Sequence, residues 1–515
     1  MPRGARAALV ALVAVGAALR LWQYFANASL WIDEIAVAQN VLYWPLAHLL
    51  KDPLALDQVA PPLFLAAVKG VAWAWGSSER ALRLVPLVSG LLALVLFPRL
   101  TRRFQPPWIA VFATGLFALA PTLIAHGAEL KPYSTDLLAA VALTLAAFGL
   151  DARASAARFA GAAVLGAAAV WFSQGAVFVV AGLAAALFVL ARRERAVSGR
   201  LVALVAAWAV SAGLAVVSGL HRVPPDMRAY LDRFWTPSLP KIPLLVFVAV
   251  AAWLLWKRSP RAALLLVGPV AVALAAAAAK LYPFSGRAIL FLAPAAILAL
   301  AEAAGWIVEG LARVQVPRKV AAAIPALALV GLIAHEPPVY RDEDARPVLA
   351  ALAARWQPGD ALYVYYGGGR SFRYYGPLVH LPSDGAVLGG CHRSEPRGYL
   401  RELDRFRGRP RVWVFRTHVS HGLGEGPLVD GYLARLGKKV DRIEADDADA
   451  TLWNLSGGAE VPADLAETYP LPPGDPALAA RLGCGHGPIG TAPWDHPGGV
   501  NHPGGVNAEN LNWRN

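Results

Sequence analysis

Residues 201–220 read LVALVAAWAVSAGLAVVSGL, a run of apolar and small residues without a single charge. A helix of about 20 apolar residues is long enough to cross the hydrocarbon core of a bilayer. The chain of 515 residues contains several such runs, and it is 57% hydrophobic but only 16% charged, against roughly 25% charged residues in soluble globular proteins. The sequence therefore predicts a mainly α-helical, polytopic membrane protein and excludes a soluble multidomain enzyme or a disordered chain.

Apolar segments of this kind recur along residues 1–335, and each is a candidate crossing. They lie near residues 8–25, 62–76, 84–98, 108–125, 134–150, 159–172, 175–191, 201–219, 242–256, 262–279, 288–306 and 320–335. The first segment resembles a signal peptide in composition, but it continues to Trp22 without a convincing small-residue cleavage site. We therefore expect an uncleaved first transmembrane helix.

Six basic clusters lie between the apolar segments and predict the orientation of the chain, because cytoplasmic loops carry an excess of Lys and Arg. The clusters are Arg3/Arg6, Arg99/Arg102/Arg103, Arg153/Arg158, Arg192/Arg193/Arg195/Arg200, Lys257/Arg258/Arg261 and Arg313/Arg318/Lys319. If all six face the cytoplasm, an even number of crossings must separate neighbouring clusters. Three candidate crossings lie between Arg6 and Arg99, which is one too many. The weakest is 62–76, which is short and contains Lys69, so we interpret it as an interfacial helix. About eleven transmembrane helices result, with a cytoplasmic N-terminus and the chain after about residue 336 outside.

The formal net charge is +13, which in a soluble protein would suggest a nucleic-acid partner. Here most of the excess lies in the six basic clusters, where it serves orientation. No basic stretch outside the apolar segments is interleaved with aromatic residues. We therefore expect membrane lipids as neighbours and no nucleic acid.

The pattern changes after the last apolar segment. The stretches ALYVYYG at 361–367 and RVWVFRTHV at 411–419 are typical of buried strands. Helical patterns near 345–356, 397–406 and 427–437 alternate with them. We therefore expect a transmembrane domain at 1–335, with its first outer loop at 26–80, followed by a small extracytoplasmic αβ domain at 336–460.

The remaining chain, 461–515, is rich in Pro and Gly and ends in two copies of HPGGVN, at 496–501 and 502–507. This composition predicts a poorly ordered tail; its repeated histidines are a weaker candidate for loose metal binding. Cys391 and Cys484 both lie on the predicted outer side, where an oxidising compartment permits a disulfide. Their spacing gives no signal, so the pairing stays open.

The first outer loop contains ASLWIDEIAVAQN at 28–40, with Asp33 and Glu34 adjacent. Two neighbouring acids at a membrane boundary lose solvation, which raises the pKa of whichever lacks a cationic partner. Such a carboxylate can act as a general base towards a hydroxyl or an amine. The alternative is that both acids complement the dipole at a helix N-terminus.

Two further outer turns carry mixed charges. The stretch HGAELKPYSTD at 126–136 contains His126, Glu129, Lys131 and Tyr133. These side chains could hold a phosphate, a sugar hydroxyl or a metal, or they could only extend to the interface from a helix end.

The other turn, KLYPFSGRAILFLAP at 280–294, contains Lys280, Tyr282 and Arg287. Arg287 stands at the outer end of a predicted helix, against the usual charge bias, and a guanidinium is suited to bidentate contacts with phosphate. A membrane-boundary acid together with several outer cations favours a lipid-phosphate substrate.

Four blocks of the chain resemble the GT-C membrane glycosyltransferases of the protein O-mannosyltransferase and lipid A aminoarabinose transferase type, most of all their bacterial branch called RgtA/B/C/D-like. The blocks are SLWIDEIAVAQN, APPLFLAAVKGVAWAWGSSERALRLVPLVSG, AELKPYS and LYPFSGRAILFLAP. Their order and spacing over roughly residues 5–310 carry the resemblance.

The resemblance implies roles for individual residues. Asp33 corresponds to the catalytic base, with Glu34 in support. The donor would be a polyprenyl-phosphate sugar whose phosphate meets Arg287 and Lys131. His126 and Glu129 would lie near the donor or an optional divalent metal. Tyr133, Tyr282 and Lys280 complete the expected donor site, and the family usually has Arg where this chain has Lys131.

These observations predict an inverting glycosyltransferase, hexosyl- or pentosyl-transferring, that moves a sugar to an envelope acceptor on the outer face of a bacterial plasma membrane. No cofactor is certain, and no metal ligands are assigned. One alternative is a transporter or flippase for a lipid-linked sugar, although the internal repeats common in transporters are not evident. Another is a surface-glycan polymerase or ligase. A dominant internal outer loop would indicate such an enzyme, whereas the large outer segment predicted here is C-terminal. The identity of the sugar and the acceptor, the oligomeric state and the role of the C-terminal domain do not follow from the sequence.

Overall fold

The computed structural model describes residues 1–56, 58–222, 241–284, 286–315, 339–382, 385–418, 425–457 and 461–471, with single residues between 317 and 331. The chain forms two compact units. The first comprises residues 1–27, 41–54 and 59–340, and the second comprises 28–40, 55–58 and 341–515. The second unit thus includes parts of the first outer loop, and the domain boundaries expected from the sequence stay a prediction.

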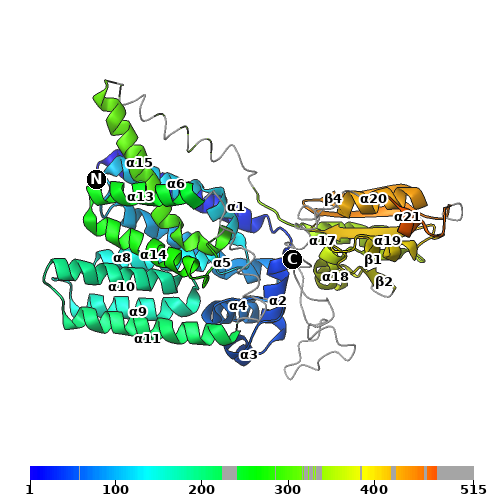
Figure 1. Ribbon diagram of the computed structural model, residues 1–515, viewed down its shortest axis with the longest axis horizontal. Helices are drawn as coiled ribbons and strands as arrows, with labels where there is room; N and C mark the ends of the chain where they lie inside the picture. Colours follow the sequence, from blue (N-terminus) through cyan, green and yellow to red (C-terminus); the bar gives the residue numbers. More distant parts are fainter. Residues whose placement is uncertain are drawn as a thin grey trace. The chain divides into compact units, whose positions relative to one another are not determined.

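The first unit is helical (Figure 1). Its longer helices are α1 (Arg3–Phe25), α4 (Pro62–Trp75), α5 (Glu79–Thr101), α6 (Pro107–Leu119), α8 (Tyr133–Phe148), α9 (Ala156–Phe172), α10 (Ala176–Arg193), α11 (Gly199–Arg222), α13 (Lys241–Arg258), α14 (Pro260–Ala278) and α15 (Ala293–Arg313). Its short helices are α3 (Leu46–Lys51), α7 (Pro121–Ala125), η1 (His126–Ala128) and η2 (Gly286–Leu292). Eleven of the twelve apolar segments predicted from the sequence are helices in the structure, and segment 320–335 lies almost wholly outside the described residues.

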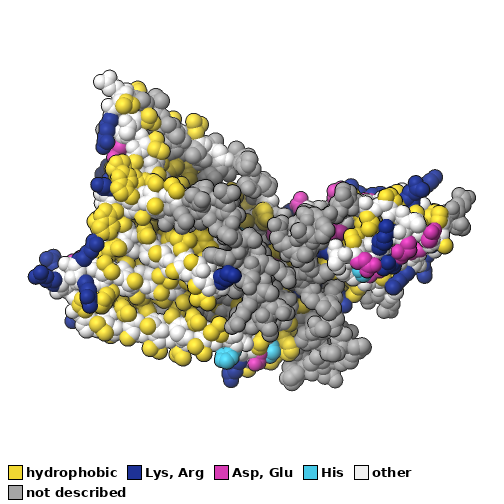
Figure 2. Space-filling view, viewed as in Figure 1, with side chains coloured by type: hydrophobic (Ala, Val, Ile, Leu, Met, Phe, Trp, Pro, Cys, Tyr) yellow, Lys and Arg dark blue, Asp and Glu magenta, His cyan; other side chains and the backbone are white. Residues whose placement is uncertain are grey.

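The helices have the apolar character that a bilayer requires. Among the described residues, six helices are long and apolar enough to span a membrane, or seven if the bent pair α6–α7 is one span. Among the described residues on the face seen in Figure 2, hydrophobic side chains predominate over this unit, and Lys and Arg gather mainly at its left edge. The chain is therefore a polytopic membrane protein; the total of eleven spans and the interfacial placement of α4 stay predictions.

Basic turns that are distant in the sequence meet at one end of the first unit. Arg261 donates to the carbonyl of Leu150 at 2.5 Å, and Arg200 donates to that of Ala154 at 3.3 Å. The positive-inside rule requires this gathering of positive charge on one side. That this side faces the cytoplasm stays a prediction.

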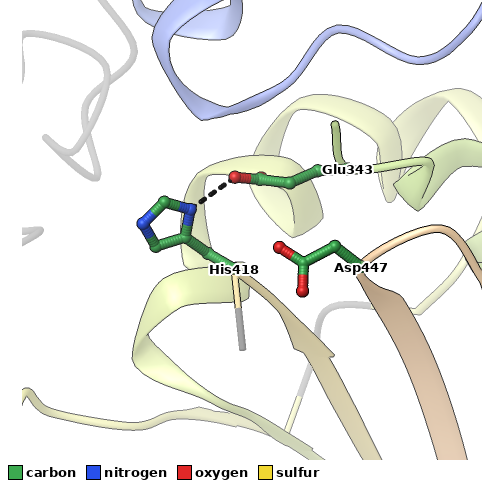
Figure 3. Close-up of side chains that lie close together, drawn as sticks. All are labelled: Glu343, His418 and Asp447. Atoms are coloured by element: carbon green, nitrogen blue, oxygen red, sulfur yellow. Dashed lines mark hydrogen bonds and ion pairs between the residues drawn. The ribbon is translucent and has the colours of Figure 1, made fainter. Parts of the chain in front are cut away.

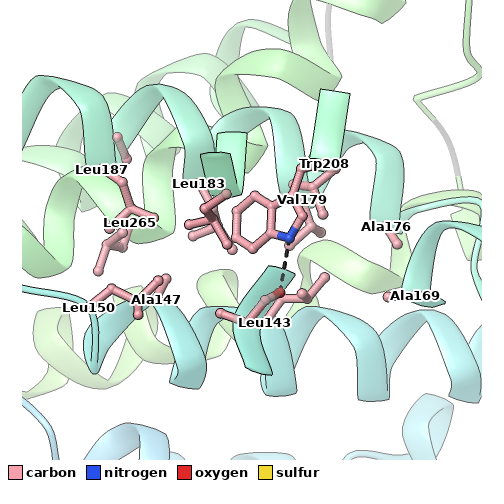
Figure 4. Close-up of a cluster of buried hydrophobic side chains, with 14 of the residues drawn as sticks. Leu143, Ala147, Leu150, Ala169, Ala176, Val179, Leu183, Leu187, Trp208 and Leu265 are labelled. Atoms are coloured by element: carbon pink, nitrogen blue, oxygen red, sulfur yellow. Dashed lines mark hydrogen bonds between the residues drawn. The ribbon is translucent and has the colours of Figure 1, made fainter. Parts of the chain in front are cut away.

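Close helix packing uses small residues, as is common in membrane proteins. Trp208 of α11 lies in a cluster of buried apolar side chains and donates from its ring nitrogen to the carbonyl of Ala162 of α9 at 3.0 Å (Figure 4). A Cβ at Gly166 would lie 2.1 Å from that ring nitrogen. The absence of a side chain at Gly166 therefore makes room for Trp208.

The chain bends by 57° between α6 and α7. Pro121 begins α7 and has no N–H, so it cannot bond to the carbonyl of Phe117 one turn earlier. The guanidinium of Arg20, which is fully buried in α1, donates to the carbonyls of Phe117 at 3.2 Å and Ala118 at 3.0 Å. Arg20 thus satisfies carbonyls that the bend releases.

The second unit contains a five-stranded mixed sheet in the order β2-β1-β3-β5-β4. Its strands are β1 (Ala361–Val364), β2 (Ala386–Leu388), β3 (Val412–Thr417), β4 (Lys438–Ala445) and β5 (Ala448–Asn454). Strand β1 pairs in parallel with β2 and β3, while β5 pairs antiparallel with β3 and β4. The two predicted strands are β1 and β3, and both are fully buried.

Helices surround this sheet. They are α17 (Ala345–Arg355), α18 (Gly369–Tyr375), α19 (Arg397–Asp404), α20 (Glu425–Leu436) and α21 (Leu465–Thr468). Tyr399 of α19 and Leu433 of α20 pack in one buried cluster with Tyr363 and Val414 of the sheet. The small αβ unit expected from the sequence is therefore confirmed, whereas residues 472–515, most of the predicted tail, lie outside the described part.

The bonds of Arg20 predict a specific loss of stability. Arg20→Leu leaves the two buried carbonyls at the bend without their donor, at a cost of about 1–3 kcal/mol each. The melting temperature of the purified protein in detergent should therefore fall by several degrees. The matched control is Arg99→Leu. Arg99 donates to the carbonyl of Val95, four residues earlier, at 2.9 Å, as Arg20 also does to that of Gly16, but Arg99 is exposed. Equal melting temperatures for Arg20→Leu and the control would contradict this role.

Candidate active site

The bend before α7 leads into a polar turn that the sequence had singled out. After η1, the chain passes Glu129, Lys131 and Pro132 and begins α8 at Tyr133. Ser134 fixes the turn by donating from its hydroxyl to the carbonyl of His126 at 2.7 Å. The turn therefore presents its charged residues between two apolar helices.

Glu129 is the centre of this turn. It is buried, and its carboxylate binds the Nδ1 atom of His126. Its other oxygen lies 3.6 Å from the guanidinium of Arg287, which comes from η2 in a distant part of the sequence. Gly286, just before Arg287, has a φ of +50°, a conformation that glycine adopts at little cost.

The charges around Glu129 keep it ionised. Burial alone would raise the pKa of this carboxyl, but the hydrogen bond from His126 and the charges of His126, Arg287 and Lys131 together lower the pKa below its ordinary value. An ionised Glu129 fixes the position of Arg287, whose side chain remains 38% exposed. The Arg287 side chain is thus both anchored and accessible.

An aromatic ring completes the cluster. Tyr133 meets His126 edge to face at 5.1 Å, and the guanidinium of Arg287 lies 5.8 Å from the centre of the Tyr133 ring. Lys131 is buried beside Glu129. The structure therefore brings together five of the predicted residues, hereafter the Glu129 cluster: His126, Glu129, Lys131, Tyr133 and Arg287.

The other two predicted donor-site residues have different settings. The hydroxyl of Tyr282 donates to the carbonyl of Ala288 at 2.7 Å, and its ring packs 4.6 Å from that of Phe178. Burial raises the pKa of Tyr282, so its hydroxyl stays protonated. This bond closes the turn that carries Arg287. Lys280 is exposed just after α14, with a φ of +57°. Their roles as donor ligands stay predictions.

Asp136 is a buried acid in the first turn of α8 to which the sequence assigned no role. It hydrogen-bonds to the side chain of Ser173 and to the backbone of Gln174 and Gly175. These bonds connect α8 to the turn between α9 and α10. The signal in the sequence was an isolated acid at the start of an apolar helix, where ionisable residues are rare.

Asp33 and Glu34 belong to helix α2 (Ile32–Tyr43) and lie in its first turn. Glu34 is buried, and its carboxylate accepts a hydrogen bond from the backbone N–H of Trp31 at 3.3 Å. Asp33 is only partly buried. Glu34 therefore caps the helix, while Asp33 is the more accessible of the two acids.

The segment before α2 is held within the second unit by hydrogen bonds that include those to Asp344 and Tyr375. The backbone N–H and the hydroxyl of Ser29 donate to one oxygen of Asp344, at 3.1 and 2.5 Å. The backbone N–H of Leu30 donates to the hydroxyl of Tyr375 at 2.6 Å. These contacts fix the backbone from which Asp33 projects.

A third group of ionisable residues was not predicted. Glu343, His418 and Asp447 of the second unit place one potential ligand atom each within 4.8 Å of one another. They lie in three separate parts of the sequence, so no motif spacing could have revealed them. The sequence left open whether Cys391 and Cys484 form a disulfide. Cys484 lies outside the described residues, so this pairing stays open.

Comparisons with known proteins give matches among solved structures alone. No family model and no curated protein matches the chain. The chain is similar to ArnT from Cupriavidus metallidurans in the apo state, at 16% identity over 87% of this chain and 98% of that one, with a TM-score of 0.45. For ArnT from Cupriavidus metallidurans bound to undecaprenyl phosphate, the identity is 15% over 86% of this chain and 97% of that one, with a TM-score of 0.46.

The chain is also similar to the Archaeoglobus fulgidus oligosaccharyltransferase tethered with an acceptor peptide. The identity is 11% over 88% of this chain and 74% of that one, with a TM-score of 0.43. At these identities and with TM-scores below 0.5, the likenesses by themselves establish neither the fold nor the activity of this chain.

The lowered pKa of Glu129 predicts a pH-dependent contribution to stability. A depressed folded-state pKa stabilises the protein above the ordinary carboxyl range, and this contribution disappears as the pH falls through the lowered value. Glu129→Gln should therefore lower the melting temperature at pH 7, by the equivalent of about 1–3 kcal/mol. The difference from wild type should begin to narrow as the pH falls below the ordinary carboxyl pKa of about 4.3, and it should close below the lowered pKa of Glu129.

The control is Glu444→Gln, because Glu444 pairs with Arg442 at 2.9 Å on the surface, with both side chains about half exposed. Such exposed pairs contribute about 0–1 kcal/mol, so this variant should follow wild type at every pH. If the melting temperature of Glu129→Gln stays below that of wild type by the same amount as the pH falls from 7 to 3, Glu129 is not the ionised group that stabilises the turn.

Proposed function

We propose that this chain is an inverting glycosyltransferase that moves a sugar from a polyprenyl-phosphate donor to an envelope acceptor on the outer face of a bacterial plasma membrane. The observation that carries the proposal is the Glu129 cluster, which holds Arg287 and Lys131 at the ends of apolar helices. A lipid phosphate is the ligand that such positive charge at a membrane boundary suits. The ordered resemblance of four sequence blocks to GT-C enzymes supports the same function.

In the proposed reaction, Asp33 accepts the proton of an acceptor hydroxyl. The acceptor oxygen attacks the anomeric carbon, the bond from that carbon to the phosphate oxygen breaks, and the polyprenyl phosphate leaves with the electron pair. Attack opposite to the leaving group inverts the anomeric centre. The free energy of the reaction comes from the donor linkage, so no nucleotide is needed.

Arg287 and Lys131 would act on the leaving group. A phosphodiester donor carries one negative charge, whereas the released phosphate monoester carries about −1.5 to −2 at neutral pH. Cations placed at this phosphate therefore stabilise the transition state more than the bound donor, which is the condition for catalysis. Lys131 offers a point charge where the family usually has Arg, so Arg287 is the bidentate phosphate ligand in this proposal.

The remaining predicted residues support these groups. Glu129 and His126 would orient Arg287. The ring of Tyr133, which contacts the Arg287 guanidinium, would limit the movement of that group. Tyr282 would hold the turn that carries Arg287. Glu34 would hold the first turn of α2, so that Asp33 keeps a fixed direction.

The proposed base has a direct test. Asp33→Asn removes the proton acceptor with little change in shape, so transfer should fall at least 100-fold. Membranes that contain the variant would be incubated with lipid extract from a deletion strain, and the conversion of polyprenyl-phosphate sugar to polyprenyl phosphate would be followed by mass spectrometry. The control is Asp52→Asn, because Asp52 lies in the same loop with its side chain 53% exposed. Near-normal conversion by Asp33→Asn would refute the assignment.

The phosphate site has a separate test that requires no known sugar. Binding of undecaprenyl phosphate to the purified chain would be measured by native mass spectrometry. Arg287→Gln removes a charged contact of about 1.5–3 kcal/mol, so the dissociation constant should rise roughly 10- to 100-fold. Arg80→Gln is the control, because Arg80 is an exposed arginine at the start of α5. Equal affinities of the two variants would exclude Arg287 as the phosphate ligand.

A further inference from the structure

Glu343, His418 and Asp447 come together because backbone bonds align three turns of the second unit. His418 directly follows β3, and its N–H donates to the carbonyl of Asp447, in the β4–β5 turn, at 3.3 Å. The segment before α17 joins them through a bond from the N–H of Asp344 to the carbonyl of Asp446 at 2.8 Å. Three side chains from distant parts of the sequence thus meet on a scaffold fixed by the sheet.

The backbone at this place is unusual. His418 has a φ of +60° and Asp447 a φ of +46°. Residues with a side chain rarely adopt this left-handed conformation, and it persists where the surrounding structure enforces it, often at functional sites. Together the two conformations direct an imidazole and a carboxylate to the same side as Glu343 (Figure 3).

The side chains form a compact set of donor atoms. One ligand atom from each residue lies within 4.8 Å of the other two. The Nδ1 atom of His418 lies 2.6 Å from a carboxylate oxygen of Glu343, a contact drawn as a dashed line in Figure 3. Ligands around a zinc ion at about 2.1 Å lie about 3.4 Å apart in tetrahedral geometry, so small side-chain rotations bring these atoms to binding distance.

A second observation points to a missing ligand. Glu343 is only 2% exposed, and its second oxygen, Oε2, has no hydrogen-bond partner among the described residues. A buried carboxylate oxygen without a partner is costly, and such groups are usually paired or bound to a metal. Asp342 adds negative charge near Glu343. The charge of Arg393 acts on His418, but Arg393 itself pairs with Glu425 at 3.2 Å.

We propose that Glu343, His418 and Asp447 bind a divalent cation, with Zn²⁺ preferred. One imidazole nitrogen and two carboxylate oxygens are donors that zinc accepts, whereas Ca²⁺ and Mg²⁺ favour oxygen ligands alone. Three protein ligands leave a fourth position for water. The ion would take the place of the direct contact between His418 and Glu343, and it would satisfy the buried carboxylate.

The ion would stabilise the segment that leads to α2. Asp344, the neighbour of Glu343, accepts both bonds from Ser29, and the N–H of Arg346 donates to the Ser29 hydroxyl at 3.0 Å. Fixing Glu343 to β3 and to the β4–β5 turn therefore also restrains the start of the helix that carries Asp33. This role is structural, and the ion takes no part in the proposed transfer reaction.

The test is zinc binding to the full chain in detergent, purified with a tag that contains no histidine and stripped with EDTA. Zinc would be titrated by calorimetry, and bound metal would be counted by elemental mass spectrometry after removal of excess. We expect one zinc per chain for wild type. Glu343→Gln, His418→Gln and Asp447→Asn should each weaken binding at least 10-fold, since each removes one ligand charge or donor. Asn tolerates the left-handed conformation at position 447, so this variant should keep the turn.

Two controls separate this site from others. His392→Gln removes a histidine that pairs with Glu402 at 2.8 Å in the same unit, and it should bind zinc as wild type does. The double variant His496→Ser, His502→Ser removes the histidines of the HPGGVN repeats and should also keep the stoichiometric site.

A rise in the melting temperature with zinc in wild type, absent in Asp447→Asn although both melt alike in EDTA, would support the site and exclude a folding defect. Equal zinc binding by wild type and the three ligand variants, or no binding by wild type, would overturn the proposal. Because binding is measured directly, either result leaves the proposed glycosyl transfer untouched.

Discussion

The guanidinium of Arg20 bonds to the carbonyls of Phe117 and Ala118, and the geometry of the membrane unit around the Glu129 cluster depends on this contact. A bilayer offers no water to an unpaired carbonyl, so a chain can break a helix there only where another group supplies the donor. Pro121 causes the break, and Arg20 makes it tolerable. The turn that follows then places Glu129 where it can pair with Arg287 from a distant loop.

The burial of each charged side chain indicates its role. Buried acids orient neighbours: Glu129 holds Arg287 and Glu34 caps α2. The partly exposed Asp33 and Arg287 are the groups that a substrate can reach, and they are therefore the proposed base and phosphate ligand. Glu343 differs, because one oxygen of its buried carboxylate has no partner among the residues that the structure describes, which is the basis of the proposed cation site.

The helices and the membrane class could be predicted because an apolar run of bilayer length has few alternatives. The Glu129 cluster was predicted in part, since its residues lie at helix ends where charges are otherwise rare. The hairpin β4–β5 was missed because β4 is largely exposed and rich in charge, so it lacks the alternation of a half-buried strand. The contact of Arg20 and the grouping of Glu343, His418 and Asp447 depend on tertiary packing, which no local pattern encodes.

The proposed enzyme consumes a polyprenyl-phosphate sugar outside the plasma membrane. The most direct measurement is mass spectrometry of polyprenyl-phosphate sugars and of envelope glycans in a strain that lacks the gene, compared with the complemented strain. One lipid-linked sugar should accumulate in the deletion strain, and one sugar residue should disappear from an envelope glycan, lipid or protein. Unchanged pools of both in the deletion strain would contradict this proposal.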